Sequence, residues 1–194
     1  GAGMIKIRGD DCWRDLTCLE YHHETQPMPN PLSWYFHNLP AWFHKIEVLG
    51  NHFFQLVVPW GLFLPQPFPM ISGILIIISQ FWLVLSGNFS WLNWMAILLA
   101  TTTIPNGVYL KMIPSWAIQT LQVNIIHKYT TYIIGGIFLL LNFWPIKNVF
   151  SKNQKMNASF NRWHLSNTYG AFGSVTKKRY EIVLEGTADK KILA

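Results

Sequence analysis

Histidines gathered in the first third of the chain offer the strongest argument for metal chemistry. The group comprises His22, His23, His37, His44 and His52, with Glu24 beside the first pair. Imidazole and carboxylate groups bind zinc, and a membrane metalloenzyme could use such a set. However, we predict an extended loop here, in which adjacent side chains point in opposite directions, and the chain has no HExxH motif. We therefore favour polar capping of a membrane surface, with no metal, cofactor or catalytic residue. An enzyme that uses the His22–Glu24 loop stays as the alternative.

Two cysteines, Cys12 and Cys18, lie in the same polar stretch. They could close a small disulfide if this stretch faced an oxidising compartment. Free thiols are an equal alternative, because spacing alone does not provide the geometry that a disulfide needs.

Two sequences match the acceptor pattern for N-glycosylation, at Asn88 and Asn157. Asn88 lies in a tight turn at the predicted membrane surface, where we expect no modification. Asn157 follows the last predicted span, and it is a candidate glycosylation site if the tail faces the lumen.

The distribution of charge predicts the elements that must position these residues. No Asp, Glu, Lys or Arg occurs from Val48 to Leu110, and a second uncharged run extends from Tyr129 to Ile146. Helices of soluble proteins need a wetted polar face, whereas such runs are expected in lipid. Most of the ten tryptophans also lie near the ends of apolar runs, as interfacial anchors do. We predict a mainly α, polytopic bundle of transmembrane helices.

About four spans fit the apolar runs. They are Glu47–Leu64 with a kink at Pro59, Phe68–Ser86, Phe89–Ile104 and Tyr129–Ile146. The third is marginal, because a span needs about 20 apolar residues. Pro105–Lys128 fits a surface-lying segment better than a span. Residues 1–46 are predicted to form a polar loop and an interfacial helix, Pro31–Leu39, after a span that precedes Gly1.

Polar residues inside the spans favour helix packing over a buried site. Thr131 and Gly135 follow a small-xxx-small pattern, and Ser72, Ser79 and Gln80 lie near one face of the second span. Uncharged polar side chains commonly hold membrane helices together. A transporter path lined by Asn51, His52, Gln55 and Gln80 is a further alternative, but no charged residue inside a span supports ion coupling.

The tail, residues 147–194, differs in character, with nine basic and three acidic residues. Arg162–Thr168 and Val175–Glu185 are predicted strands, the second because its side chains alternate in character. Two strands alone are marginal in water, so the tail is predicted to begin a larger β-rich soluble domain. The chain contains no nucleic-acid-binding fold, so we predict no nucleic-acid partner.

Four strings of residues resemble the lipase maturation factor family. GAGMIKIRGDDCWRDLTCLEYHHETQPMPNP resembles the signature segment, and NHFFQLVVP, LSGNFSWLNW and SNTYGAFGSVTKKRYEIVLEGTAD resemble later segments. The resemblance runs from Gly1 to about Asp189, interrupted around Thr101–Val149. In the last of these strings, Lys177-Lys178-Arg179 before the strand resembles the first of the two vertebrate family members more than the second.

The resemblance implies a non-enzymatic, multi-pass protein of the endoplasmic reticulum membrane that assists the folding and assembly of secreted lipases. In the family the carboxyl-terminal domain faces the lumen and contacts the lipase. The client-binding candidates here are therefore Asn167, Thr168, Tyr169, Gly170, Phe172, Gly173, Arg179, Tyr180 and Glu181. The signature loop, whose role the resemblance does not assign, includes Cys12, Trp13, Arg14, Asp15, Cys18, His22, Glu24, Gln26, Pro27, Pro29, Asn30 and Pro31.

The chain departs from the family pattern at two points. Gln55 stands where the family usually has an acid, and TTTIPNG replaces a stretch that tends to carry two acids.

The positive-inside rule would put the lysine-rich end of the last span in the cytosol, whereas the family has it in the lumen. We follow the family, because a partial chain shows only part of the loop charges that decide orientation.

Overall fold

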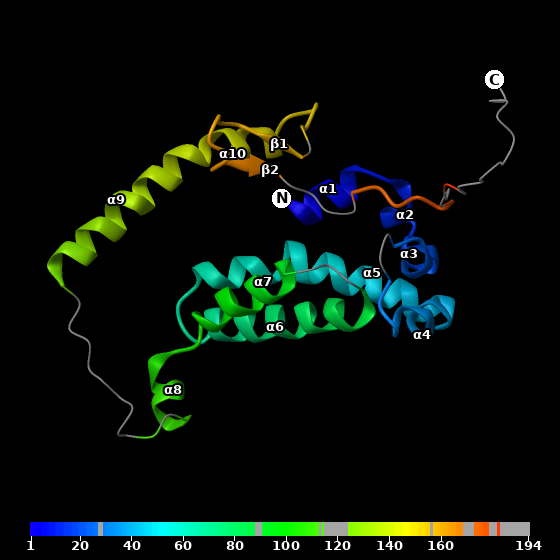
Figure 1. The fold of residues 1–194 in the computed structure, drawn as a ribbon, viewed down its shortest axis with the longest axis horizontal. Helices are drawn as coiled ribbons and strands as arrows, with labels where there is room; N and C mark the ends of the chain where they lie inside the picture. The colour runs from blue at the N-terminus through cyan, green and yellow to red at the C-terminus, as the bar shows by residue number, and fades with distance from the viewer. Residues whose placement is uncertain are drawn as a thin grey trace, which may run out of the picture.

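Helices dominate the architecture (Figure 1). The structure is a computed structural model that describes residues 1–26, 29–87, 91–112, 114, 124–155, 157–168, 173–178 and 182. The elements are α1 Ala2–Arg8, α2 Asp11–Arg14, α3 Leu19–Thr25, α4 Ser33–His37, α5 Ala41–Leu56, the 3-10 helix η1 Val58–Phe63, α6 Phe68–Ser86, α7 Leu92–Thr101, α8 Asn106–Met112, α9 Ile125–Leu141, α10 Phe143–Val149, β1 Ala158–Ser159 and β2 Asn167–Thr168.

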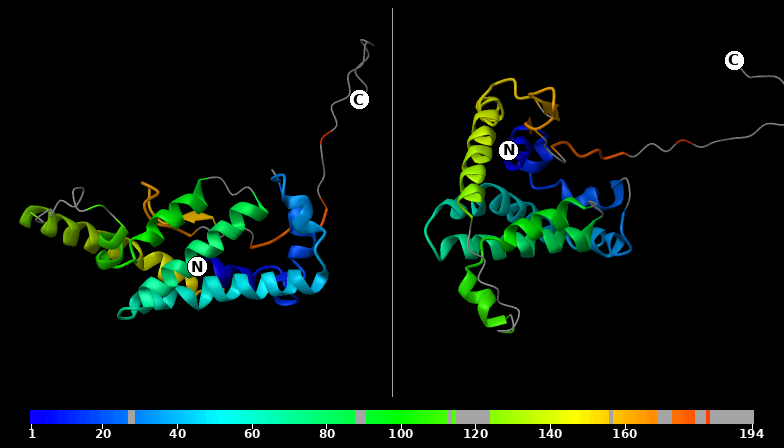
Figure 2. Two further views of the ribbon diagram at one scale, coloured as in Figure 1. Left: turned by 90° about the horizontal axis from the view of Figure 1, so that it is seen from below. Right: turned by 60° about the vertical axis from the view of Figure 1, so that its left-hand side comes forward.

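Helices α5, α6 and α7 lie side by side and form the central layer (Figures 1 and 2). Gly73 of α6 and Ala100 of α7 meet at their contact, where a Cβ on Gly73 would lie 2.9 Å from the Ala100 carbonyl oxygen. Small residues permit this close approach of backbones, as they do between helices in membranes.

Two helical stretches are long and apolar enough to cross a membrane, Phe68–Ser86 and Ile125–Val149. The first is α6 and has the bounds predicted for the second span, and the other includes the predicted span Tyr129–Ile146. The other two predicted spans are shorter as helices. The predicted span Glu47–Leu64 is divided into α5 and η1 around Pro59, whose ring nitrogen has no hydrogen to donate. The predicted span Phe89–Ile104 contains α7, which has ten residues.

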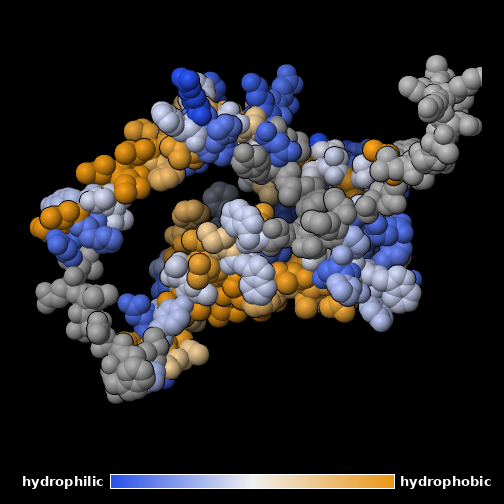
Figure 3. Space-filling model, viewed as in Figure 1, coloured by the Kyte–Doolittle hydropathy of each residue, from blue (hydrophilic) through white to orange (hydrophobic). Residues whose placement is uncertain are grey.

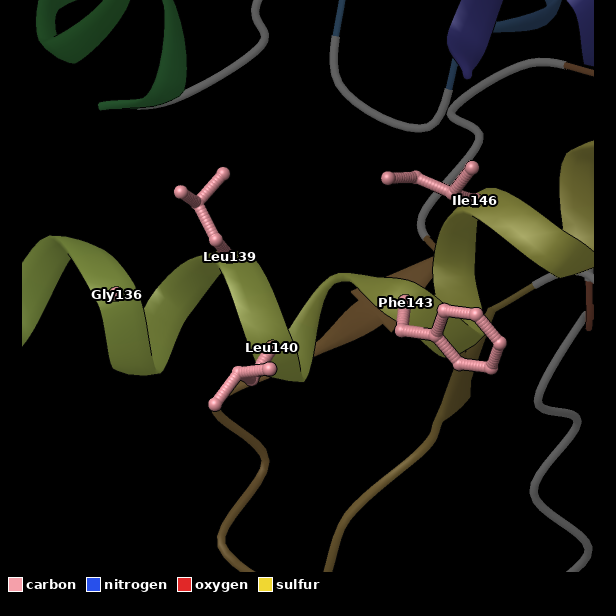
Figure 4. Close-up of a pocket in the computed structure, with 5 residues that line it drawn as sticks. All are labelled: Gly136, Leu139, Leu140, Phe143 and Ile146. Atoms are coloured by element: carbon pink, nitrogen blue, oxygen red, sulfur yellow. The ribbon is translucent and has the colours of Figure 1, made fainter.

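Helix α9 lies apart from the central layer, and none of its residues is buried (Figures 1 and 2). Apolar side chains cover much of its visible surface, shown in orange in Figure 3. The close-up in Figure 4 shows the junction with α10, where Leu139, Leu140, Phe143 and Ile146 line a shallow apolar hollow with Gly136. A helix with apolar residues exposed on several sides is suited to lipid rather than water.

The predicted extended loop over residues 10–30 is wrong, because the structure forms α2 and α3 there. The Asp10 carboxylate accepts a hydrogen bond from the Cys12 amide at 3.2 Å and caps α2. The buried apolar core of this region comprises Cys12, Trp13, Cys18, Leu19, Val48 and Val175. These short helices are therefore stabilised by packing. So few residues do not show the periodic apolar pattern by which a helix is predicted.

Helix α4 lies within the predicted interfacial helix Pro31–Leu39. Asn30 caps the start of this segment, since its Oδ1 accepts from the amides of Leu32 at 2.7 Å and Ser33 at 3.0 Å. The side chains of Trp34 and Tyr35 are exposed, as expected at a headgroup level.

The described part of the tail forms a small antiparallel sheet. Ala158 pairs with Thr168, and Ser159 pairs with Asn167. Only the last two residues of Arg162–Thr168 are therefore in a strand. The Asn161 side chain accepts from the Leu165 amide at 2.8 Å, and such local bonds favour turns over strands. Residues 175–178 form no strand, and most of the second predicted strand lies outside the described residues.

After the sheet, residues 173–175 run along the amino-terminal segment. The Asp10 amide donates to the Gly173 carbonyl at 3.2 Å, and the Val175 amide donates to Asp10 Oδ2 at 3.4 Å. The backbones come so close that a Cβ on Gly9 would lie 2.5 Å from the Gly173 oxygen. The tail and the amino-terminal segment thus form one packed unit.

Candidate functional site: a polar cap on the central helices

The described residues of 10–38 rest on the start of α5 and the end of α6, and we call them the polar cap. The last carbonyl groups of any helix lack partners within that helix. At the end of α6, three side chains of the polar cap supply these partners. Gln26 Nε2 donates to the Ser86 oxygen at 3.4 Å, and Ser33 Oγ donates to the same oxygen at 2.9 Å.

Asn30 joins the two elements most directly. Its Nδ2 donates to the carbonyl oxygens of Val84 at 3.0 Å and Leu85 at 2.9 Å, while its Oδ1 caps the α4 segment. Gln26 and Asn30 belong to the predicted signature loop, and the structure gives both a position against α6. Ser33 was missed, although an Asn-Pro-Leu-Ser run is a recognisable capping pattern.

Cys12 and Cys18 form a disulfide in the structure, with their Cα atoms 4.8 Å apart. Both residues are buried beside Trp13 and Val48. The bond closes the turn between α2 and α3 and holds these short helices against α5. Of the two alternatives that the sequence left open, the structure has the disulfide.

A buried cluster of His23, His44 and Glu47 joins α3 to the start of α5. Their ligating atoms all lie within 4.8 Å of one another. His44 Nδ1 is 3.1 Å from Glu47 Oε2, and His23 Nε2 is 3.7 Å from the same oxygen. The side chains of all three are almost fully shielded from solvent.

The sequence did not predict this grouping. In the sequence, Glu47 is only the first residue of a predicted span, and of the two histidines only His23 belongs to the predicted extended loop. Two signals were available: His44 and Glu47 are three residues apart and share a helix face, and Glu47 is the last acidic residue before the long uncharged run.

His22 and Glu24 do not join the cluster. Burial, with smaller contributions from His23 and Lys6, lowers the pKa of His22 to about 4, so its ring is neutral at physiological pH. Glu24 pairs with His37 at 3.3 Å on the exposed side. The predicted enzyme alternative required His22, His23 and Glu24 to act together, and the structure does not bring their ionisable groups to one point.

Lys6 of α1 is a buried cation that the sequence did not single out. Its Nζ donates to Asn51 Oδ1 at 2.9 Å and lies 4.6 Å from the centroid of the Trp13 ring. Burial lowers the pKa of Lys6 to about 8. Asn51 and Trp13 thus hold a cation between α1 and α5.

The residues of the transporter alternative are divided between two surroundings. Asn51 bonds to Lys6, and His52 Nε2 lies 3.0 Å from the Trp13 carbonyl oxygen. Gln55 lies against Gly3 of α1. These three side chains of α5 contact the amino-terminal segment, while Gln80 belongs to α6, so no shared path is formed by the four.

The remaining signature residues have varied positions. Trp13 is 2% exposed and is part of the buried core, whereas Arg14 forms an exposed ion pair with Asp11. Asp15, Pro29 and Pro31 are exposed, and Pro27 lies outside the described residues. The segment therefore combines a buried inner face with a hydrophilic outer one.

Three of the nine client-binding candidates lie in the described part of the tail. Asn167 Nδ2 donates to the His164 carbonyl at 2.7 Å, and Thr168 Oγ1 donates to the Lys155 carbonyl at 3.0 Å. Gly173 lies against Gly9. The other six are outside the described residues: Tyr169, Gly170, Phe172, Arg179, Tyr180 and Glu181. Their role in client binding stays a prediction.

Asn157 is exposed and has a left-handed backbone conformation, with φ of 51°. The structure therefore leaves this glycosylation candidate accessible, and its modification stays a prediction. Asn88, where no glycosylation is expected, lies outside the described residues.

Comparison with known proteins adds a family to this geometry. Residues 1–111 match a family model described as the lipase maturation factor transmembrane domain. Lipase maturation factor 1 of Homo sapiens is 41% identical over 212 aligned residues, which cover 100% of this chain and 37% of that protein. The Mus musculus protein of the same name is 40% identical over 207 residues, covering 96% of the chain and 36% of that protein.

Lipase maturation factor 2 of Xenopus laevis is 35% identical over 108 residues, which cover 53% of the chain and 15% of that protein. No solved structure matches the chain. The chain thus spans little more than a third of the human relative. The family model covers more than half of the chain, and the human and mouse relatives align with nearly all of it. The chain therefore belongs to the lipase maturation factor family.

Proposed function

We propose that the protein is a multi-pass membrane protein of the endoplasmic reticulum that assists the folding, assembly and maturation of secreted lipases without catalysing a reaction itself. The observation that carries the proposal is the 41% identity to human lipase maturation factor 1 along the whole chain. Binding of partly folded lipases would limit their aggregation while apolar surface is still exposed.

The disulfide supports a lumenal position for the polar cap. Disulfides persist in oxidising compartments such as the lumen of the endoplasmic reticulum and are rare in the cytosol. The tail touches the polar cap through Asp10 and Gly173, and this contact supports a position of both on the same side of the membrane. This contact supports a lumenal tail, in agreement with the family and against the positive-inside rule.

The same contact supports an even number of crossings between the polar cap and the tail. The four predicted spans meet this condition. On this proposal α5 leaves the lumenal side, α6 returns to it where Ser33 and Asn30 cap its end, α7 leaves again, and α9 with α10 returns. The residues after α10 then begin a β-rich lumenal domain, which holds the lipase.

Lipase secretion from cells that lack the full-length protein tests the proposal. We expect secreted lipase to have a lower specific activity and to regain it when the full-length protein is restored. A matched secreted protein with disulfides but no lipase fold is the control, and its specific activity should not change. Unchanged lipase activity after deletion would reject the proposed function.

A further inference from the structure

The donor set at the junction of α3 and α5 consists of two imidazoles and one carboxylate. Within the part of the chain that the structure describes, His23, His44 and Glu47 are a group whose ligand atoms lie close enough to share an ion, within 4.8 Å. Zinc and similar transition ions prefer such nitrogen and oxygen donors.

His44 lies between two acceptor oxygens. Its Nε2 is 3.4 Å from the His37 carbonyl oxygen, and its Nδ1 is 3.1 Å from Glu47 Oε2. A neutral imidazole carries only one hydrogen, so one of the two nitrogens turns a lone pair toward an oxygen. With the hydrogen on Nε2, Nδ1 turns its lone pair toward Glu47 Oε2. Two acceptors this close repel each other unless a positive charge lies between them. A second proton on the ring or a metal ion supplies that charge.

His23 distinguishes the metal ion from the proton. The residue is 3% exposed, neither of its ring nitrogens has a partner at hydrogen-bond distance among the described residues, and its Nε2 lies 3.7 Å from Glu47 Oε2. Buried polar atoms rarely remain without close partners, because burial removes their hydrogen bonds to water. A proton on His44 leaves His23 with this long contact alone, whereas one ion between the three residues binds a lone pair of each.

The surroundings of the cluster support its ligands as metal sites usually require. Trp82 Nε1 of α6 donates to Glu47 Oε1 at 2.9 Å, and the His37 carbonyl orients His44. Such outer partners fix the direction of ligands and are typical of zinc centres. The Phe36 ring lies 5.8 Å from that of His23 and shields it.

We propose that His23, His44 and Glu47 bind a divalent transition-metal ion, with Zn²⁺ the best match to their donors. The ion ties α3 of the polar cap to the start of α5, next to the point where Asn30 ties α4 to the end of α6. Its role is structural, since the three ligands are buried. This site is independent of whether the protein acts on lipases.

Zinc measured in the purified full-length protein tests the proposal. The wild type, equilibrated with micromolar Zn²⁺ and freed of excess ion, should retain about one zinc ion per chain more than His23→Gln. His52→Gln is the matched control, because His52 lies on α5 outside the cluster, and it should retain the wild-type zinc content. Cobalt in place of zinc should give the wild type a visible absorption band that His23→Gln lacks.

The wild type alone provides a second readout that does not depend on the folding of a variant. Treatment with a chelator should lower its melting temperature in detergent, and Zn²⁺ should restore it. Wild-type protein that retains no zinc and melts at the same temperature with and without Zn²⁺ would overturn the proposal. So would equal zinc content in the wild type and a folded His23→Gln.

Discussion

Single polar residues connect the polar cap to the helices below it. Asn30 uses both ends of its amide, Oδ1 for the α4 segment and Nδ2 for the end of α6. His23, His44 and Glu47 perform the corresponding task at the start of α5. These contacts join segments that are far apart in the sequence, and together they hold the polar cap in place.

Replacement of Asn30 by Ala should destabilise the protein by about 1–3 kcal/mol. The reason is that carbonyl groups at the end of α6 and amides of the α4 segment lose their partner at once. The melting temperature of the detergent-solubilised full-length protein measures the effect. Asn38→Ala is the matched control, since Asn38 is exposed and donates only to Trp34 of its own segment. An equal change in both variants would contradict the assigned role of Asn30.

The Cys12–Cys18 disulfide should stabilise the folded protein by about 2 kcal/mol, the value expected for a short closed loop. The double variant Cys12→Ala/Cys18→Ala should therefore melt earlier than the wild type, and a reducing agent should lower the melting temperature of the wild type alone. Thiol labelling after denaturation should find both cysteines blocked in protein from cells. Two labelled thiols in denatured, unreduced protein would disprove the bond.

At the scale of elements, sequence predicted the apolar helices better than the polar ones. Helix α6 has its predicted bounds, because prolines before Phe68 and Gly87 after Ser86 delimit an uninterrupted apolar run. Pro59 predicted the division of the first span. Helices α2 and α3 were missed, because they are too short for periodicity and depend on the disulfide and on packing against Val48.

The candidate site was less predictable than the fold. Sequence identified the histidines, Cys12, Cys18, Gln26 and Asn30, but it could not select His23 and His44 among the histidines or add Glu47. Their grouping depends on the placement of α3 against α5, which is a long-range contact. The predicted strand Arg162–Thr168 was largely wrong for a related reason, because only its last two residues pair, and they pair with β1, which precedes them in the chain.

Docking of the tail on the polar cap should depend on Val175, which is buried in the same apolar cluster as Cys12 and Leu19. Val175→Asp should release this segment, because an unpaired charge is costly in an apolar core. Limited trypsin digestion should then cleave after Lys177 and Lys178 faster than in the wild type. Leu165→Asp, at a position 54% exposed, should leave the cleavage rate unchanged. Equal rates in all three proteins would show that the tail does not dock there.

At the scale of the whole molecule, lipid and water explain different surfaces. The exposed apolar residues of α9 suit hydrocarbon, whereas the hydrophilic outer face of the polar cap and the sheet of the tail suit water. The contact between the polar cap and the tail supports the proposal that the chain crosses the membrane an even number of times between them. The four proposed spans satisfy this requirement with both surfaces in the lumen.

Glycosylation mapping in cells tests this arrangement most directly. Asp15→Asn creates an acceptor Asn-Leu-Thr in the polar cap, Glu185→Asn creates Asn-Gly-Thr in the tail, and Val108→Thr creates an acceptor at Asn106, on the proposed cytosolic side. In the full-length protein, the first two variants should each gain a glycan that a glycosidase removes, and the third should gain none. A glycan at only one of the first two positions, or at Asn106, would contradict a polar cap and a tail that share the lumenal side.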